Sequence, residues 1–112
     1  MISLKEIVGS IFEKTQSGKL TWNHLGANVF QAIVGDNSVT IDRRRISPGG
    51  VTAPAPYELV FRDSEGNILE TVDQSSAAYF EMNLEQLHEL IRRQALHVEE
   101  TLLDIKHTLD NL

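Results

Sequence analysis

The sequence predicts an α+β protein: an N-terminal helix, an antiparallel sheet of about four or five strands, and a long or broken C-terminal helix packed on the sheet. Three observations support this prediction. Apolar residues recur at helical spacing near both ends of the chain, they alternate with polar residues in the middle, and a Gly-Asp-Asn turn separates two of the alternating runs. A chain of 112 residues and 12.6 kDa has room for one domain, residues 1–112.

The first element is predicted as a helix over residues 3–16. Ser3 and Glu6 have the spacing of a capping box, in which the side chain of each residue binds the backbone N–H of the other. Apolar residues then recur every three or four positions, which is the period of a helix with one buried face. Gly18 is a natural end for this helix, because glycine adopts the left-handed backbone conformation at little cost.

Residues 19–73 are predicted to form a meander of strands. Five runs carry the pattern: residues 20–24, 29–34, 38–44, 57–61 and 68–73. The turn at residues 35–37 predicts a tight hairpin, and residues 63–67, with a glycine near their end, suit a turn that closes into a bulge. Residues 47–56 hold all three prolines and are predicted to be a loop.

The last third of the chain is predicted to be helical from Asn83, a good N-cap residue. Residues 74–82 are ambiguous. The apolar residues beyond Asn83 step by three or four positions, close to a heptad seam: Leu84, Leu87, Ile91, Ala95, Val98, Leu102, Ile105, Leu109 and Leu112. An irregular step near Ala95 leaves two interpretations open, one helix over residues 83–112 or two helices with a break near His97.

Composition excludes several classes of function. Ten Lys and Arg against sixteen Asp and Glu give a formal charge of -6, which argues against binding to nucleic acid or to an anionic membrane. The absence of cysteine removes disulfides, thiol nucleophiles and thiolate metal sites. No apolar run reaches the roughly 20 residues that span a bilayer, and no secretory signal is evident, so we expect a cytoplasmic protein.

Catalytic and metal-binding residues are not predicted. His88, His97 and His107 fall on the final helical segment, where 100° per residue keeps them from converging on one ion, so we interpret them as solvated helix surface. The carboxylates lie in turns or on helix faces, and there is no nucleophile elbow. We therefore expect no enzyme activity, no cofactor and no metal site.

The aromatic residues Trp22, Tyr57 and Phe61 are expected in the core rather than around a ligand. Residues 43–45 form a run of three arginines, the longest in the sequence. Arg43 and Arg45 would share one face of a strand, where they either discourage sheet-to-sheet aggregation or pair with acidic residues of the final helix, within one chain or across a dimer. The second use fits the charge distribution, since residues 47–112 hold twelve acidic residues against four basic ones.

The segment around Arg92-Arg93 and residues 94–105, together with Trp22 and the run at residues 57–61, resembles short uncharacterised bacterial proteins. These proteins have an N-terminal helix, a Trp-bearing β-meander and a C-terminal acidic amphipathic helix. The resemblance implies a fold pattern and a bacterial, cytoplasmic setting, and it carries no known activity. Where those proteins tend to have glycine before the last helix, this chain has His97.

We predict a non-enzymatic protein-interaction module that self-associates through its C-terminal helix, giving a homodimer. A helix of roughly 28 residues would be about 42 Å long and would extend past a five-strand sheet about 24 Å wide, so a second copy is expected to cover the excess. The expected interaction residues are Val98, Leu102, Ile105, Leu109, Leu112, Arg43 and Arg45. Two alternatives stay open: an acidic inhibitor of the antitoxin or immunity type with an unknown basic protein partner, and a small-ligand-binding or enzymatic domain.

Overall fold

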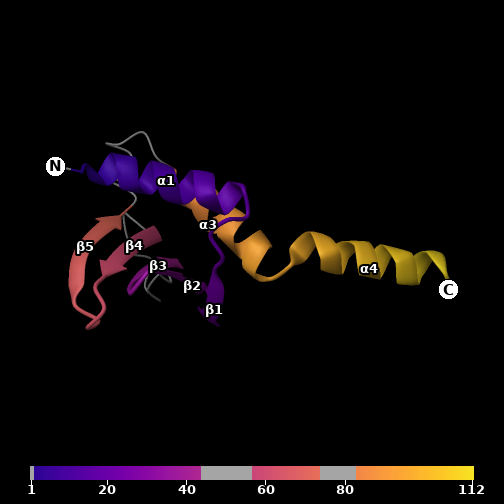
Figure 1. Cartoon of the computed structure of the whole chain (residues 1–112). Coiled ribbons are helices and arrows are strands. Elements are labelled where there is room, and N and C mark those ends of the chain that lie inside the picture. Colours follow the sequence, from indigo (N-terminus) through magenta and orange to yellow (C-terminus); the bar gives the residue numbers. More distant parts are fainter. Residues whose placement is uncertain (1, 44–56, 74–82) are drawn as a thin grey trace, which may run out of the picture.

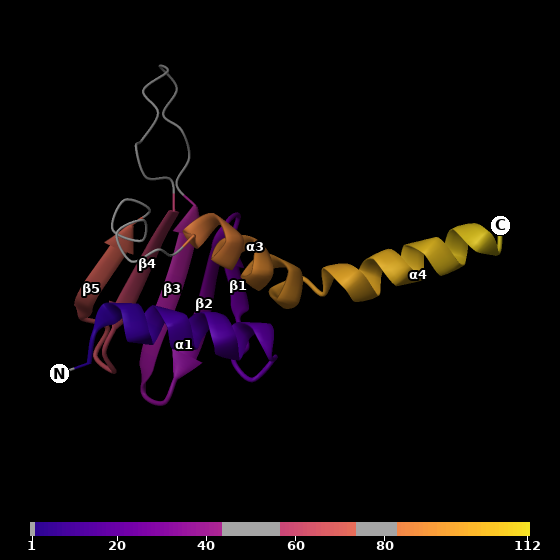
Figure 2. The same ribbon diagram turned by 90° about the horizontal axis from the view of Figure 1, so that it is seen from above.

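The structure is a computed structural model that describes residues 2–43, 57–73 and 83–112. It confirms the α+β fold. Five antiparallel strands follow one another in the order β1-β2-β3-β4-β5, and the helices α1 and α3 lie on one face of this sheet (Figures 1 and 2). The elements are α1 (Leu4–Gln16), β1 (Asn23–Gly26), β2 (Val29–Val34), β3 (Asn37–Arg43), β4 (Tyr57–Arg62), β5 (Ile68–Asp73), α3 (Leu84–Ala95) and α4 (Val98–Asp110).

Helix α1 begins and ends as the sequence predicts. The backbone N–H of Glu6 donates to the Ser3 hydroxyl at 3.2 Å, which is one half of the capping box. At the other end Gly18 has φ +77°, and the N–H groups of Lys19 and Leu20 both donate to the carbonyl of Lys14 at 3.0 Å. This left-handed cap folds the chain back beside the last turn of the helix.

The central hairpins also follow the prediction. Val34 pairs with Asn37, so Gly35 and Asp36 form a two-residue turn, and Gly35 takes φ +64° there. The register between β4 and β5 shifts at Phe61/Arg62, which confirms the expected bulge. The predicted loop at residues 47–56, the ambiguous residues 74–82 and the last residue of the run 38–44 lie outside the described residues.

Strand β1 differs from the prediction, because it starts at Asn23 instead of residue 20. The reason is the side chain of Gln94 in α3. Its amide nitrogen donates to the Leu20 carbonyl at 2.9 Å, and its amide oxygen accepts the Trp22 N–H at 3.2 Å. These backbone groups are therefore bonded to a helix side chain and are not available for a sheet ladder.

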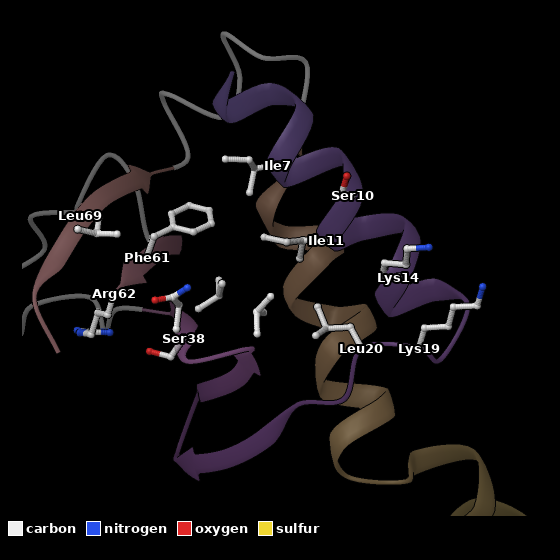
Figure 3. Close-up of a pocket in the computed structure, with 13 residues that line it drawn as sticks. Ile7, Ser10, Ile11, Lys14, Lys19, Leu20, Ser38, Phe61, Arg62 and Leu69 are labelled. Atoms are coloured by element: carbon white, nitrogen blue, oxygen red, sulfur yellow. The ribbon is translucent and has the colours of Figure 1, made fainter. Parts of the chain in front are cut away.

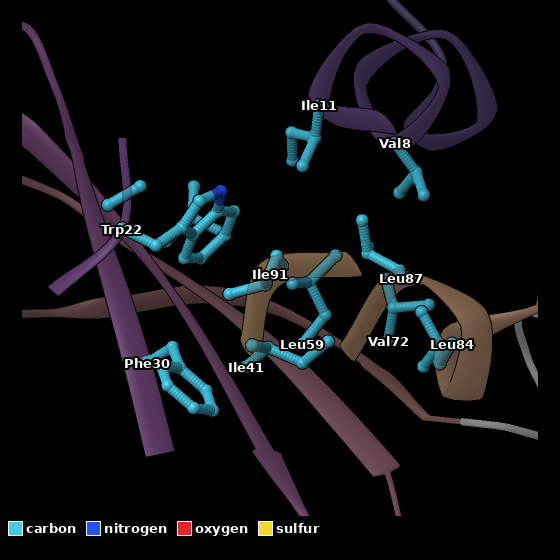
Figure 4. Close-up of a cluster of buried hydrophobic side chains, with 12 residues drawn as sticks. Val8, Ile11, Trp22, Phe30, Ile41, Leu59, Val72, Leu84, Leu87 and Ile91 are labelled. Atoms are coloured by element: carbon cyan, nitrogen blue, oxygen red, sulfur yellow. The ribbon is translucent and has the colours of Figure 1, made fainter. Parts of the chain in front are cut away.

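The core lies between the sheet and the two covering helices (Figure 4). Side chains of α1 and α3 meet those of β2 to β5 there, and Trp22, which is 4% exposed, closes the cluster. Tyr57 and Phe61 are half-buried and pack against it. The expectation that these aromatics belong to the core is confirmed for Trp22, whereas Tyr57 and Phe61 lie at the margin of the core, where each also lines a cavity. The buried apolar residues of the cluster are Val8, Ile11, Trp22, Phe30, Ala32, Val39, Ile41, Leu59, Val72, Leu84, Leu87 and Ile91.

The C-terminal segment is two helices. Asn83 caps α3 by accepting the N–H of Gln86 at 3.1 Å, and the chain breaks at His97, which has φ 51°. Helix α3 packs on the sheet, whereas α4 extends away from the body of the protein (Figures 1 and 2). Of the two interpretations that the sequence left open, the break near His97 is the one observed.

Asp63 gives the β4–β5 turn a predictable pH dependence. The pKa of its carboxyl is lowered, first by the Asn67 side-chain amide and then by backbone N–H groups of the turn. Since the folded-state pKa lies below the unfolded value, this stabilisation is fully present above the unfolded pKa and is lost as the pH falls through the folded one. We expect Asp63→Ala to lower Tm at neutral pH and the Tm gap from the parent to close in acid. Thermal unfolding followed by circular dichroism measures the gap, with Ser64→Ala as the control, and a gap that does not change with pH would contradict the assignment.

Candidate interaction surface

Helix α4 presents an apolar face that the described part of the chain leaves largely exposed. Of its thirteen residues, none is buried. At 100° per residue, four side chains of the helix fall within an arc of about 60°. Together with Leu112, which follows the end of the helix, we call them the α4 stripe: Val98, Leu102, Ile105, Leu109 and Leu112. Val98 is half-buried at the start of the helix, while Leu102, Ile105 and Leu109 are 51%, 50% and 61% exposed. The predicted interaction residues of this helix therefore share one exposed face.

The two flanks of the α4 stripe carry different side chains. Glu99 and Lys106 lie along one flank, and Thr101 and Thr108 lie along the other, as their positions on the helix require. Lys106 donates to Asp110 at 2.7 Å within the helix. A partner helix would thus meet one charged flank and one uncharged flank. Which flanks face each other depends on whether the two helices run parallel or antiparallel.

The direction of α4 is set at its junction with α3. Arg93 of α3 forms an ion pair with Glu99 in the first turn of α4, and the His97 carbonyl accepts the Thr101 N–H at 3.0 Å. Within α3, a hydrogen bond from Arg92 lowers the pKa of the Glu89 carboxyl. Of these contacts, the Arg93–Glu99 ion pair bridges the break and joins the first turn of α4 to the end of α3.

Arg43 does not pair with an acid of α4 among the residues that the structure describes. Its guanidinium lies 5.9 Å from the centre of the Tyr57 ring, at a cleft of about 350 Å³ that Glu85, His88 and Arg92 also line. Arg45, the other arginine expected at an interface, lies outside the described residues. The structure therefore places four of the five apolar interaction residues on one face of α4, with Leu112 just beyond the helix, and Arg43 lies at a different site.

The interpretation of His88 as solvated surface is wrong. Its side chain is 4% exposed, and the Nε2 atom lies 3.0 Å from the carbonyl oxygen of Asn28, with the ring packed against Phe30 and Tyr57. Because a carbonyl oxygen only accepts, Nε2 carries the proton in this hydrogen bond. The helical period contained this information, since His88 follows Leu84 by four residues and precedes Ile91 by three, so it belongs to the buried face.

His97 and His107 are exposed, as expected. Across residues 2–43, 57–73 and 83–112, no three histidine or acidic side chains are grouped so that they could hold a metal ion. None of the helices in this part of the chain is long and apolar enough to cross a membrane.

Gln94 joins three segments of the chain by hydrogen bonds, a structural role that the sequence did not reveal. Besides its bonds to Leu20 and Trp22, its amide nitrogen lies 3.3 Å from the carbonyl of Thr15 at the end of α1. The Trp22 indole N–H donates to the Thr15 hydroxyl at 3.0 Å, so Thr15 is hydrogen-bonded to both Gln94 and Trp22. No sequence pattern distinguishes a glutamine with this role from a solvent-exposed glutamine on a helix, and only the tertiary contact identifies it.

No known protein-family model, curated protein or solved structure matches this chain. The geometry of the site therefore has to support any functional proposal by itself.

The backbone at His97 gives a test of the junction. A non-glycine residue with φ 51° is strained by about 1–2 kcal/mol, and glycine removes that strain at a smaller cost in unfolded-state entropy. We expect His97→Gly to be more stable than His97→Ala by roughly 0.5–1 kcal/mol. Urea unfolding of the two variants measures the difference. His97→Ala is the matched reference, since both variants lose the same imidazole, and equal stability would contradict a strained left-handed junction.

Proposed function

We propose that the protein is a non-enzymatic interaction module that self-associates through α4 to form a homodimer. The observation that supports this proposal is the α4 stripe: four apolar side chains on one face of a helix from which no residue is buried, followed by the exposed Leu112. Covering a half-exposed leucine contributes on the order of 1 kcal/mol, so a partner that covers the whole stripe gains several. A second copy of the same helix is the simplest such partner, because a twofold contact uses one surface twice.

The length of α4 supports the same conclusion. A helix of thirteen residues that is not packed on anything is only marginally stable in water, because most helical stability in proteins comes from burying one face. Helix α4 has local support from the Lys106–Asp110 ion pair and from Glu99 and Glu100 at its N-terminal end. These surface effects are each worth a few tenths of a kcal/mol, and a helical partner would supply the missing packing.

The flanks of the α4 stripe favour an antiparallel pair. When two copies run antiparallel, like flanks meet, so Glu99 of one copy faces Lys106 of the other, and the threonine flanks meet each other. The layers then place Val98 opposite the partner's Leu109 and Leu102 opposite the partner's Ile105. A parallel pair would set each charged flank against a threonine flank and would gain no charge complementarity.

Substitutions on α4 test the self-association. We expect the parent to have an absolute mass of twice 12.6 kDa by light scattering on a sizing column. Leu102→Glu and Ile105→Glu should give monomers, because each places a carboxylate in the apolar seam. Leu103→Glu is the matched control, since Leu103 is 67% exposed but points about 100° away from Leu102. A dimer that survives Leu102→Glu and Ile105→Glu would exclude α4 as the contact.

Single cysteines test the direction of the pair, and the chain has no cysteine of its own. In the antiparallel arrangement, Val98→Cys and Leu109→Cys should each resist self-crosslinking under mild oxidation, because copies of either residue lie about 16 Å apart along the axis. An equimolar mixture of the two should form a mixed disulfide dimer. Efficient self-crosslinking of each variant alone would show a parallel pair and would overturn the antiparallel arrangement while retaining the dimer.

The same light-scattering measurement distinguishes self-association from the acidic-inhibitor alternative. Helix α4 carries four acidic residues and one lysine, which is the charge balance that would suit a basic protein partner. A parent that runs at 12.6 kDa at low and at high salt would leave the α4 stripe for such a partner and would overturn the proposal of self-association.

A further inference from the structure

A cavity of about 400 Å³ lies between α1 and the sheet, on the side where the β2–β3 turn and the end of β4 meet the helix. We call it the α1 groove. Helix α1 packs on α3 through Val8 and Ile11, and no residue of α3 in the described part of the chain lines the groove. The space is separate from the α4 stripe and from the cleft at Arg43.

Apolar side chains from several elements form most of the surface of the α1 groove. Ile7 and Ile11 come from α1, Leu20 from the segment before β1, and Phe61 from β4, and Figure 3 shows them gathered around one space. Val34 on β2 adds to the wall and remains 46% exposed. A concave apolar space of this volume falls in the range of small-molecule sites in proteins, about 300–1,000 Å³.

The charged residues at the α1 groove are all cationic. Lys14, Lys19 and Arg62 line it, and no aspartate or glutamate does so among the described residues. Arg62 already donates to the Thr40 hydroxyl at 3.0 Å. Neither lysine has an ion-pair partner in the described part of the chain, so these two ammonium groups are the ones available to an anion.

The cap of α1 brings the backbones of Lys14 and Lys19 together. The Lys19 N–H donates to the Lys14 carbonyl at 3.0 Å, and the left-handed Gly18 makes that return of the chain possible. Figure 3 shows both side chains at the same end of the groove, away from Phe61 and Leu69. Two lysines at one end of the groove raise the local positive potential there, which favours the binding of an anion.

We propose that the α1 groove binds a single-chain amphiphile with an anionic head group, of the fatty-acid class. The alkyl chain lies against Ile7, Ile11 and Phe61, and the carboxylate lies at Lys14 and Lys19. Apolar walls alone would accept any apolar molecule, and the pair of lysines selects the anionic one. This inference is independent of self-association through α4.

Isothermal titration calorimetry with decanoate, kept below its micelle concentration, tests the proposal on the full chain. We expect one decanoate per protomer and no comparable binding of decyltrimethylammonium, which has the same chain and the opposite charge. Lys14→Gln/Lys19→Gln should weaken decanoate binding at least about fivefold at low ionic strength and leave the binding of the uncharged decanol unchanged.

A second pair of variants locates the binding. Val34→Trp fills the groove from an exposed position, so it should abolish decanoate binding without a loss of folding. Ile33→Trp is the matched control, since the neighbouring residue is 57% exposed and points to the other face of the strand. Absence of decanoate binding to the parent, equal binding of the cationic probe, or unchanged binding to Val34→Trp would each overturn the proposal.

Discussion

One polar side chain connects the parts of this structure that local sequence signals do not connect. Gln94 bonds to the carbonyls of Thr15 and Leu20 and to the N–H of Trp22. It thereby joins the end of α1, the segment that leads into the sheet, and the last turn of α3. A buried or half-buried backbone group without a partner costs about 1–3 kcal/mol, so a single amide that satisfies three such groups constrains all three segments.

Both candidate sites depend on this constraint. Leu20 and Lys19, which line the α1 groove, leave α1 at the point that Gln94 holds. His97, where the chain turns into α4, follows Gln94 by three residues, and its N–H donates to the Gln94 carbonyl at 3.2 Å. The same end of α3 therefore fixes one wall of an apolar groove and the direction in which an apolar helix leaves the body.

The two candidate sites have opposite electrostatic character. The α1 groove is lined by cationic and neutral residues, whereas the α4 stripe lies on a helix with four acids and one lysine. This division agrees with the uneven charge of the sequence, in which residues 1–46 hold six basic and four acidic residues. Molecules that suit the two surfaces differ accordingly: a small anionic amphiphile for the first, and a helix with the same apolar seam for the second.

The sequence by itself determined the elements whose signals are local. Ser3, Gly18, Gly35 and Asn83 mark helix ends and a hairpin because caps and tight turns are decided by neighbouring residues, and the spacing of Leu102, Ile105 and Leu109 placed them on one face. Tertiary structure alone decided the start of β1 and the role of Gln94. Those outcomes depend on hydrogen bonds between residues 72 to 79 positions apart, which no local period contains.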